Sequence, residues 1–193
     1  MINSRRARRG FTMIELMMSL AILAVGVSGI IAMQKVTAMS NLHAKSVTVA
    51  TQVANSWQDQ LLVDATLWTN TAGISSTTWL KDITSKQNVW FRPSYDSARQ
   101  FGAGFDGLGN PVSDAQLART QFCVHLLLAP ATSIGPDNPG NGVIRATVRV
   151  LWPRVQSTRQ GAHFCADGEI ESIGNDLANF HFVYQTLALR VTP

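Results

Sequence analysis

An apolar run that follows a cluster of arginines constrains this chain more than any other feature. Residues 5–9 hold four arginines and no acid, and 19 residues without a charge separate Glu15 from Lys35. As a helix these residues would extend about 28 Å, which is close to the thickness of the hydrocarbon core of a bilayer. Because basic flanks stay cytoplasmic, the sequence predicts one membrane-spanning helix with the remainder of the chain exported.

Two details distinguish this segment from a cleaved secretory signal. A secretory signal carries its small cleavage-site residues after the apolar run, whereas here Gly10 lies before it, next to the arginines. Glu15 lies inside the apolar segment, one helical turn from Phe11. A carboxylate at that depth costs a few kcal/mol on insertion scales, so it indicates a functional residue that needs a partner.

The residues Gly10-Phe11-Thr12-Met13-Ile14-Glu15, together with the basic leader and the apolar run, resemble the processing motif of type IV pilins and pseudopilins. The resemblance implies that a prepilin peptidase cleaves after Gly10, that the new N-terminal Phe11 is N-methylated, and that Glu15 guides assembly. Met13 replaces the commoner leucine with a side chain of similar volume. The alternative is that Glu15 only stabilises the start of the helix, since acids favour helix N-termini.

Electrostatics explains the role that the resemblance gives to the glutamate. Cleavage exposes a positive amine at Phe11, and Glu15 of a neighbouring subunit can neutralise it within an apolar bundle, where an unpaired charge is costly. Such a pair would set the axial register between subunits more than it would add stability.

A helical pattern continues beyond the apolar run. Apolar residues recur every three or four positions, which predicts one helix from Phe11 to about residue 68; they are Val49, Val53, Trp57, Leu61, Ala65 and Trp68. No proline precedes Pro93, so none interrupts this helix. Gly26 and Gly29 either soften the helix or allow close packing between helices in the membrane.

Three apolar segments after the helix predict β-strands. They cover residues 121–128, 144–152 and 179–189, and a turn-forming stretch of Gly, Pro, Asp and Asn spans 135–142. In the second strand, apolar residues alternate with a polar face on which Arg145 and Arg149 are expected to be solvated. The order of elements predicts an α+β layer and matches the type IV pilin fold, a long N-terminal hydrophobic α-helix packed on an antiparallel β-sheet.

The predicted organisation has four parts. They are a removed basic leader (1–10), a transmembrane and filament-core half-helix (11–34), an amphipathic half-helix (35–68) and a globular head (69–193). Within the head, we expect a connecting loop at 69–116, with a short helical element at 79–83, a short strand at 88–91 and a glycine-rich loop at 102–111. The sheet and the distal region follow at 117–193.

The two cysteines, Cys123 and Cys165, lie outside the membrane segment. In an exported chain an even pair favours a disulfide, and closing a loop of 42 residues would stabilise the fold by about 4 kcal/mol. The alternative is a nucleophilic Cys123 beside His125 on one strand face. No oxyanion motif or third catalytic residue accompanies this pair, so no enzyme is expected.

Metal, cofactor and nucleic-acid sites are not expected either. The histidines (His43, His125, His163 and His181) show no metal-ligand spacing, and the glycine-rich loop has too few acids for calcium, with only Asp106 and Asp114 nearby. The net charge is +4, but four of the 16 basic residues lie in the leader, and the remaining 12 balance 12 acids. A neutral mature chain argues against strong phosphate binding.

Residues 24–34 most resemble the PilV group of minor pilins, which lack the proline that many pilins carry midway in the helix; Ala32 stands near that place. The resemblance implies a minor pilin that helps to prime or modify assembly of a type IV pilus, near the tip with other minor pilins and a large tip adhesin. Its partners would be other pilins through the N-terminal helix, the prepilin peptidase and the inner-membrane assembly platform. Before assembly the head would be periplasmic. The alternative is a minor pseudopilin of a type II secretion or DNA-uptake system.

Overall fold

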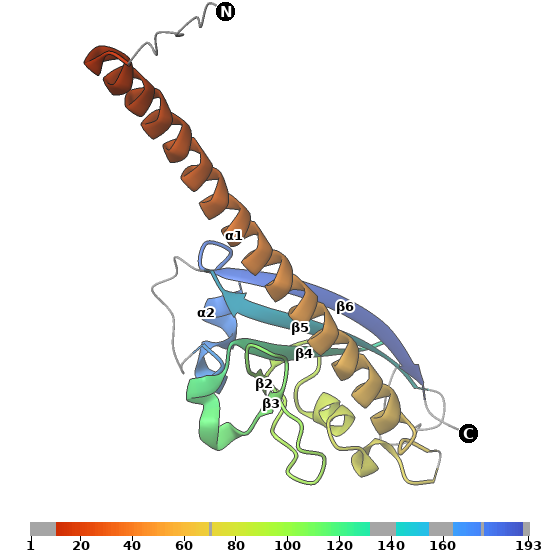
Figure 1. Cartoon of the computed structure of the whole chain (residues 1–193). Coiled ribbons are helices and arrows are strands. Elements are labelled where there is room, and N and C mark those ends of the chain that lie inside the picture. The colour runs from red at the N-terminus through yellow and green to blue at the C-terminus, as the bar shows by residue number, and fades with distance from the viewer. Residues whose placement is uncertain (1–10, 70, 132–141, 155–163, 175, 191–193) are drawn as a thin grey trace, which may run out of the picture. The chain divides into compact units, whose positions relative to one another are not determined.

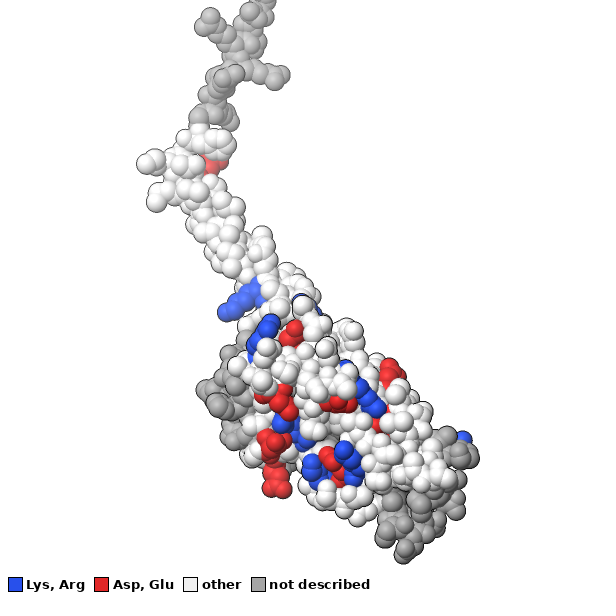
Figure 2. Space-filling view, turned by 90° about the horizontal axis from the view of Figure 1, so that it is seen from below, with Lys and Arg blue, Asp and Glu red and all other residues white. Residues whose placement is uncertain are grey.

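The computed structural model describes all residues except 1–10, 70, 132–141, 155–163, 175 and 191–193. The chain divides into two compact units, Met1–Lys45 and Ser46–Pro193. Helix α1 (Met13–Ala65) contributes to both of them. The second unit also contains the whole β-sheet, so the fold class is α+β, as predicted. Figure 2 shows most of the charged side chains on the second unit, whereas the described part of the first unit is mainly white with a few red and blue side chains.

The amphipathic pattern places the last five turns of α1 against the sheet (Figure 1). The buried side chains of this part recur on one face of the helix; they are Ala50, Val53, Ala54, Trp57, Leu61, Asp64 and Ala65. The helix ends at Ala65, slightly before the predicted end. The backbone N–H groups of the next three residues, 66–68, each donate to the carbonyl three residues earlier, and Trp68 is fully buried. The predicted long helix is therefore confirmed, and its apolar stripe is the part that the sheet covers.

Three long strands form the main part of an antiparallel sheet, close to where the sequence predicts them, and the third of them is an edge strand. They are β4 (Phe122–Pro130), β5 (Val143–Pro153) and β6 (Phe180–Arg190). Short strands β2 (Gly104–Phe105) and β3 (Pro111–Val112) extend the sheet beyond β4, which gives the order β3-β2-β4-β5-β6. Strand β1 (Trp90–Phe91) pairs with β4 farther along it. The predicted turn at 135–142 lies almost wholly outside the described residues.

Short helices occupy the connections. They are η1 (Ile74–Ser76), η2 (Leu80–Thr84), η3 (Asp114–Arg119), η5 (Asp167–Glu169) and α2 (Ile170–Gly174). Helix η2 corresponds to the short element predicted at 79–83. The other four were not predicted, since each has at most six residues and leaves no periodic pattern.

The glycine-rich segment at 102–111 is not the plain loop that its composition predicts. It forms the hairpin of β2 and β3, in which Gly104 pairs with Val112. Asp106 closes the turn, because its carboxylate accepts hydrogen bonds from the backbone N–H groups of Leu108 and Asn110, both at 2.9 Å. Gly109 has a φ of +84°, which a residue with a side chain rarely adopts. The glycines therefore permit a tight hairpin on the sheet.

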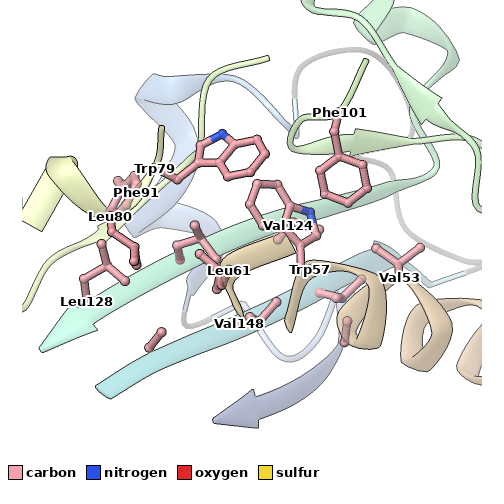
Figure 3. Packing of buried hydrophobic residues seen from close by; sticks show 14 of the residues in the cluster. Val53, Trp57, Leu61, Trp79, Leu80, Phe91, Phe101, Val124, Leu128 and Val148 are labelled. Atoms are coloured by element: carbon pink, nitrogen blue, oxygen red, sulfur yellow. The ribbon is translucent and has the colours of Figure 1, made fainter. Parts of the chain in front are cut away.

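An aromatic cluster fills the space between α1 and the sheet (Figure 3). The Trp57 ring lies 5.1 Å from that of Trp79 and 4.9 Å from that of Phe101, measured between centroids. Phe105 extends the cluster, with its ring 5.4 Å from that of Phe101. Fully burying such side chains contributes roughly 1.5–3 kcal/mol each, so this cluster anchors the connecting segment onto α1.

A buried carboxylate closes the end of α1. Asp64 is fully buried and accepts backbone hydrogen bonds from three successive residues, Thr78 at 2.7 Å, Trp79 at 2.9 Å and Leu80 at 3.1 Å. The Arg99 guanidinium donates a further bond at 3.4 Å. The carboxylate therefore caps the start of η2 and holds it against the helix. The available signal in the sequence was an acid in the apolar stripe, three residues after Leu61.

The opposite face of the sheet carries a second, smaller core that the sequence did not predict. Cys123 and Leu151 pack there with Phe164, Cys165 and Ile173. Cys123 and Cys165 form a disulfide with a Cα–Cα distance of 5.5 Å. Because these residues pack on the second face of the sheet, the C-terminal half of β5 is buried on both faces. The prediction that Arg149 is solvated is therefore wrong: it is 2% exposed, whereas Arg145 is exposed as expected.

Candidate processing and assembly segment

The start of α1 is stabilised by a threonine cap. Thr12 precedes the first helical residue, and its Oγ1 accepts a hydrogen bond from the Glu15 backbone N–H at 3.3 Å. The Thr12 carbonyl accepts bonds from Glu15 N–H at 3.1 Å and Leu16 N–H at 3.2 Å. Thr12 and Glu15 have the spacing of a capping box, in which the first residue serves as the N-cap. The cap is thus provided by Thr12, and the Glu15 side chain is not required to satisfy these groups.

The Glu15 carboxylate is exposed, and no partner for it is found among the residues that the structure describes. It also lies in the first turn, where a negative charge interacts favourably with the helix dipole. That interaction is worth less than 1 kcal/mol on an exposed helix, whereas an unpaired carboxylate within a bilayer costs a few kcal/mol. Stabilisation of the helix start alone therefore does not offset the insertion cost.

The surface around Glu15 is apolar on all sides. Every residue from 11 to 45 is exposed, and Phe11 and Met13 retain 84% and 82% of their accessible surface. An 18-residue window of α1 has a mean hydropathy of 2.3, with none of it buried, which makes the helix a candidate membrane span by length and composition. A helix that is apolar all round needs an apolar environment, which lipid or neighbouring helices can supply.

Three hydroxyl groups of this segment donate hydrogen bonds within the helix. Ser19, Ser28 and Thr37 donate to carbonyls three or four residues earlier, at 2.8, 2.7 and 2.9 Å. Such bonds remove the cost of placing hydroxyls in hydrocarbon. Glu15 is therefore the one charged side chain between Phe11 and Lys35 that still requires a partner in an apolar environment.

Gly26 and Gly29 lie within the uninterrupted helix. A Cβ built at either position would meet no atom within 4 Å, so neither glycine is required by contacts within this chain. The predicted arginine leader and Gly10 lie outside the described residues, and Phe11 is the first residue that the structure describes.

The alternative cysteine site is not available for nucleophilic chemistry, because Cys123 is held in the disulfide. His125 beside it is fully buried, with Nε2 3.8 Å from the Cys123 sulfur and Nδ1 2.7 Å from an Arg149 nitrogen. Burial, with the nearby charge of Arg149, lowers the pKa of His125 to about 3. His125 is thus neutral at pH 7, and its Nδ1 accepts the hydrogen bond from Arg149.

The histidines and acids for which the sequence predicts no metal site do not converge within the described residues. Within the described part of the chain, no group of three or more His, Cys, Asp or Glu residues is placed to hold a metal. His163 lies outside that part. Asp114 is instead engaged by Arg92, whose Nη1 lies 2.6 Å from its Oδ1.

Sequence reasoning missed the network centred on Arg92. Its guanidinium also pairs with Asp167, with a distance of 2.8 Å between Nε and Oδ1. The hydrogen bond from Arg92 holds the pKa of Asp167 below its ordinary value. Three segments far apart in the sequence are joined in this way, and residue spacing gives no signal of such a contact.

These features define a class of protein: a chain with an exposed apolar N-terminal helix, a lone carboxylate near the start of this helix, and an α+β domain consistent with the type IV pilin fold. The family model of the prokaryotic N-terminal methylation motif matches residues 5–31 of the chain. The match covers the arginines, Gly10, Phe11 and Glu15, and it supports a type IV pilin-like protein, either a pilin or a pseudopilin. No curated protein and no solved structure matches the chain.

Proposed function

We propose that this chain is a minor pilin that helps to prime or modify assembly of a type IV pilus. The observation that carries the proposal is the exposed Glu15 carboxylate, which has no described partner and lies at the start of an apolar helix within a methylation motif. In a packed bundle of such helices, the partner that fits is the positive N-terminus of another subunit.

The proposed sequence of events begins with a precursor in the inner membrane, with its arginines cytoplasmic and its head periplasmic. The prepilin peptidase cleaves between Gly10 and Phe11, and Phe11 is N-methylated. The freed amine then pairs with Glu15 of an adjacent subunit as the assembly platform moves the helix out of the membrane. The apolar surface of α1 passes from lipid to neighbouring helices, so its burial is maintained throughout.

The minor role, the position near the tip and contact with a large adhesin rest on the resemblance of residues 24–34 to the PilV group and on the missing midway proline. A minor pseudopilin of a type II secretion or DNA-uptake system would carry the same N-terminal features. Crosslinking in cells followed by identification of the joined subunits distinguishes the two, because the neighbours of a minor pilin are pilus subunits.

Two measurements test the proposal. Mass spectrometry of the native protein should show an N-terminal, methylated Phe11; a chain cut beyond residue 33, or an uncut chain recovered from filaments, would contradict it. Glu15→Gln should insert into the membrane normally but lose most of its incorporation into sheared filaments. Asp59→Asn, at an exposed acid of the same helix, is the matched control and should be incorporated normally. If filaments take up Glu15→Gln as well as the unaltered chain, the assembly role is wrong.

A further inference from the structure

A cavity of about 530 Å³ opens in the second unit beside the buried arginine of β5. Arg149, Trp90 and Tyr184 line it from three strands, and Gly174 and Glu171 line it from α2. The cavity belongs to the second unit, whereas the proposed function is assigned to the N-terminal segment, which belongs to the first. The volume is sufficient for a molecule the size of a monosaccharide.

The guanidinium of Arg149 lacks an anionic partner within the described part of the chain. It is 2% exposed, its Nε has no hydrogen-bond partner, and no described carboxylate lies within 4.0 Å of it. One of its nitrogens donates to the neutral His125 at 2.7 Å. A buried cation without a counter-ion is costly, and an incoming carboxylate would supply the missing charge.

Aromatic rings hold this guanidinium in place. Its central carbon lies 4.3 Å from the centroid of the Trp90 ring and 5.8 Å from that of Phe182. Burial lowers the pKa of Arg149, while a hydrogen bond with the Tyr184 side chain acts to raise it. The guanidinium is therefore rigid before any ligand arrives, which reduces the entropy cost of binding one.

Gly174 lies directly beside the buried guanidinium. A Cβ at this position would lie 3.0 Å from Nη1 of Arg149 and 3.5 Å from Nη2. A side chain at this position would press on these nitrogens and take up space in the cavity that Gly174 and Arg149 both line. The φ of Gly174 is not in the left-handed region, so the backbone does not require glycine here.

The rest of the lining indicates what the anion is attached to. Glu171 and Asn88 are exposed at the cavity and offer a carboxylate and an amide. The negative charge of Glu171 disfavours a multiply charged anion such as a phosphate, whereas its oxygens can accept hydrogen bonds from hydroxyl groups. The rings of Trp90 and Tyr184, 6.2 Å apart between centroids, supply apolar surface for a compact ring.

We propose that this cavity binds the carboxylate of an acidic sugar, with Arg149 pairing with the carboxylate, Glu171 and Asn88 contacting the hydroxyl groups, and Trp90 and Tyr184 contacting the ring. Charge-assisted hydrogen bonds from arginine to a carboxylate are among the stronger polar contacts in proteins.

Calorimetric titration of the full chain in detergent micelles with D-glucuronate tests this site. D-Glucose, which has the same ring without the carboxylate, should bind at least about tenfold more weakly, because a hydrogen bond to a charged group contributes more than a factor of ten. Arg149→Lys should weaken glucuronate binding by a similar factor. Arg145→Lys, at an exposed arginine of the same strand, is the matched control and should leave binding unchanged.

Gly174→Ala keeps the test decisive if Arg149→Lys fails to fold. It should weaken glucuronate binding at least about tenfold while the thermal unfolding curve stays close to that of the unaltered chain. Absence of saturable glucuronate binding, equal affinity for glucose, or full affinity in Gly174→Ala would overturn the proposal. Tighter binding of a short peptide through its terminal carboxylate would show that the ligand class is not a sugar.

Discussion

Asp64 is expected to be the most stabilising charged residue of the second unit. Its carboxylate accepts three backbone hydrogen bonds of 2.7, 2.9 and 3.1 Å, and those from Trp79 and Leu80 are buried. Replacing Asp64 with alanine leaves these N–H groups without an acceptor. Each unsatisfied buried group costs about 1–3 kcal/mol, and the loss is partly offset because the desolvation cost of the carboxylate disappears. We expect Asp64→Ala to lower the free energy of unfolding by about 3–5 kcal/mol.

The variant Asp64→Asn separates geometry from charge. It retains one oxygen acceptor but places an amide donor where Asp64 now accepts the bonds of Trp79 and Leu80. We therefore expect it to recover only a minor part of the loss.

Urea unfolding of the full chain in detergent, followed by tryptophan fluorescence, measures these changes because Trp57 and Trp79 lie in the affected core. Asp59→Ala is the control and should change the free energy by less than about 0.5 kcal/mol, since Asp59 is exposed. A loss below about 1 kcal/mol in Asp64→Ala would refute the account, because it would mean that the three N–H groups find other acceptors.

Three further predictions concern the second unit. Replacing Cys123 and Cys165 with alanine should cost about 4 kcal/mol in urea unfolding, since the disulfide closes a loop of 42 residues; no change under reducing conditions would count against this. His125 has its pKa lowered to about 3 in the fold, so stability should be full above the ordinary histidine pKa of about 6.5 and fall as the pH drops toward 3. The fall should be on the order of 4 kcal/mol and much smaller in His125→Asn. The hydrogen bond from Arg92 lowers the pKa of Asp167, so this pair should stabilise the fold above the ordinary aspartate pKa of about 3.9 and lose this effect at lower pH. Asp167→Asn should remove that part of the dependence of stability on pH. If stability below about pH 4 depends on pH equally in the variant and the unaltered chain, this account is contradicted.

Local patterns in the sequence were sufficient for the main elements of the fold. The spacing of Val53, Trp57 and Leu61 predicts both the helix and its buried face, because a helix places every third or fourth residue on one side. Alternating apolar residues likewise predict β5. Elements of only two residues, such as β2 and β3, leave no such pattern, since their place in the sheet depends on pairing with strands distant in the sequence.

The interpretation of Arg149 shows the limit of pattern reading on a single strand. Alternation assigns Arg145 and Arg149 to one face, and this assignment is right. Whether that face meets water depends on what covers it, and residues 164–174 cover only one end of β5. Burial of Arg149 is therefore a property of the assembled domain and not of the strand.

The sequence by itself was sufficient to predict the character of the N-terminal segment. The prediction needs only the order of a cluster of arginines, a lone glutamate and a charge-free run along the chain. The tertiary structure alone decided the partners of Asp64, Arg92 and Arg149, since each is set by segments that meet only in the folded domain. The physical reason is range: helix periodicity and membrane insertion depend on neighbours within a few turns, whereas a buried charge depends on every element packed around it.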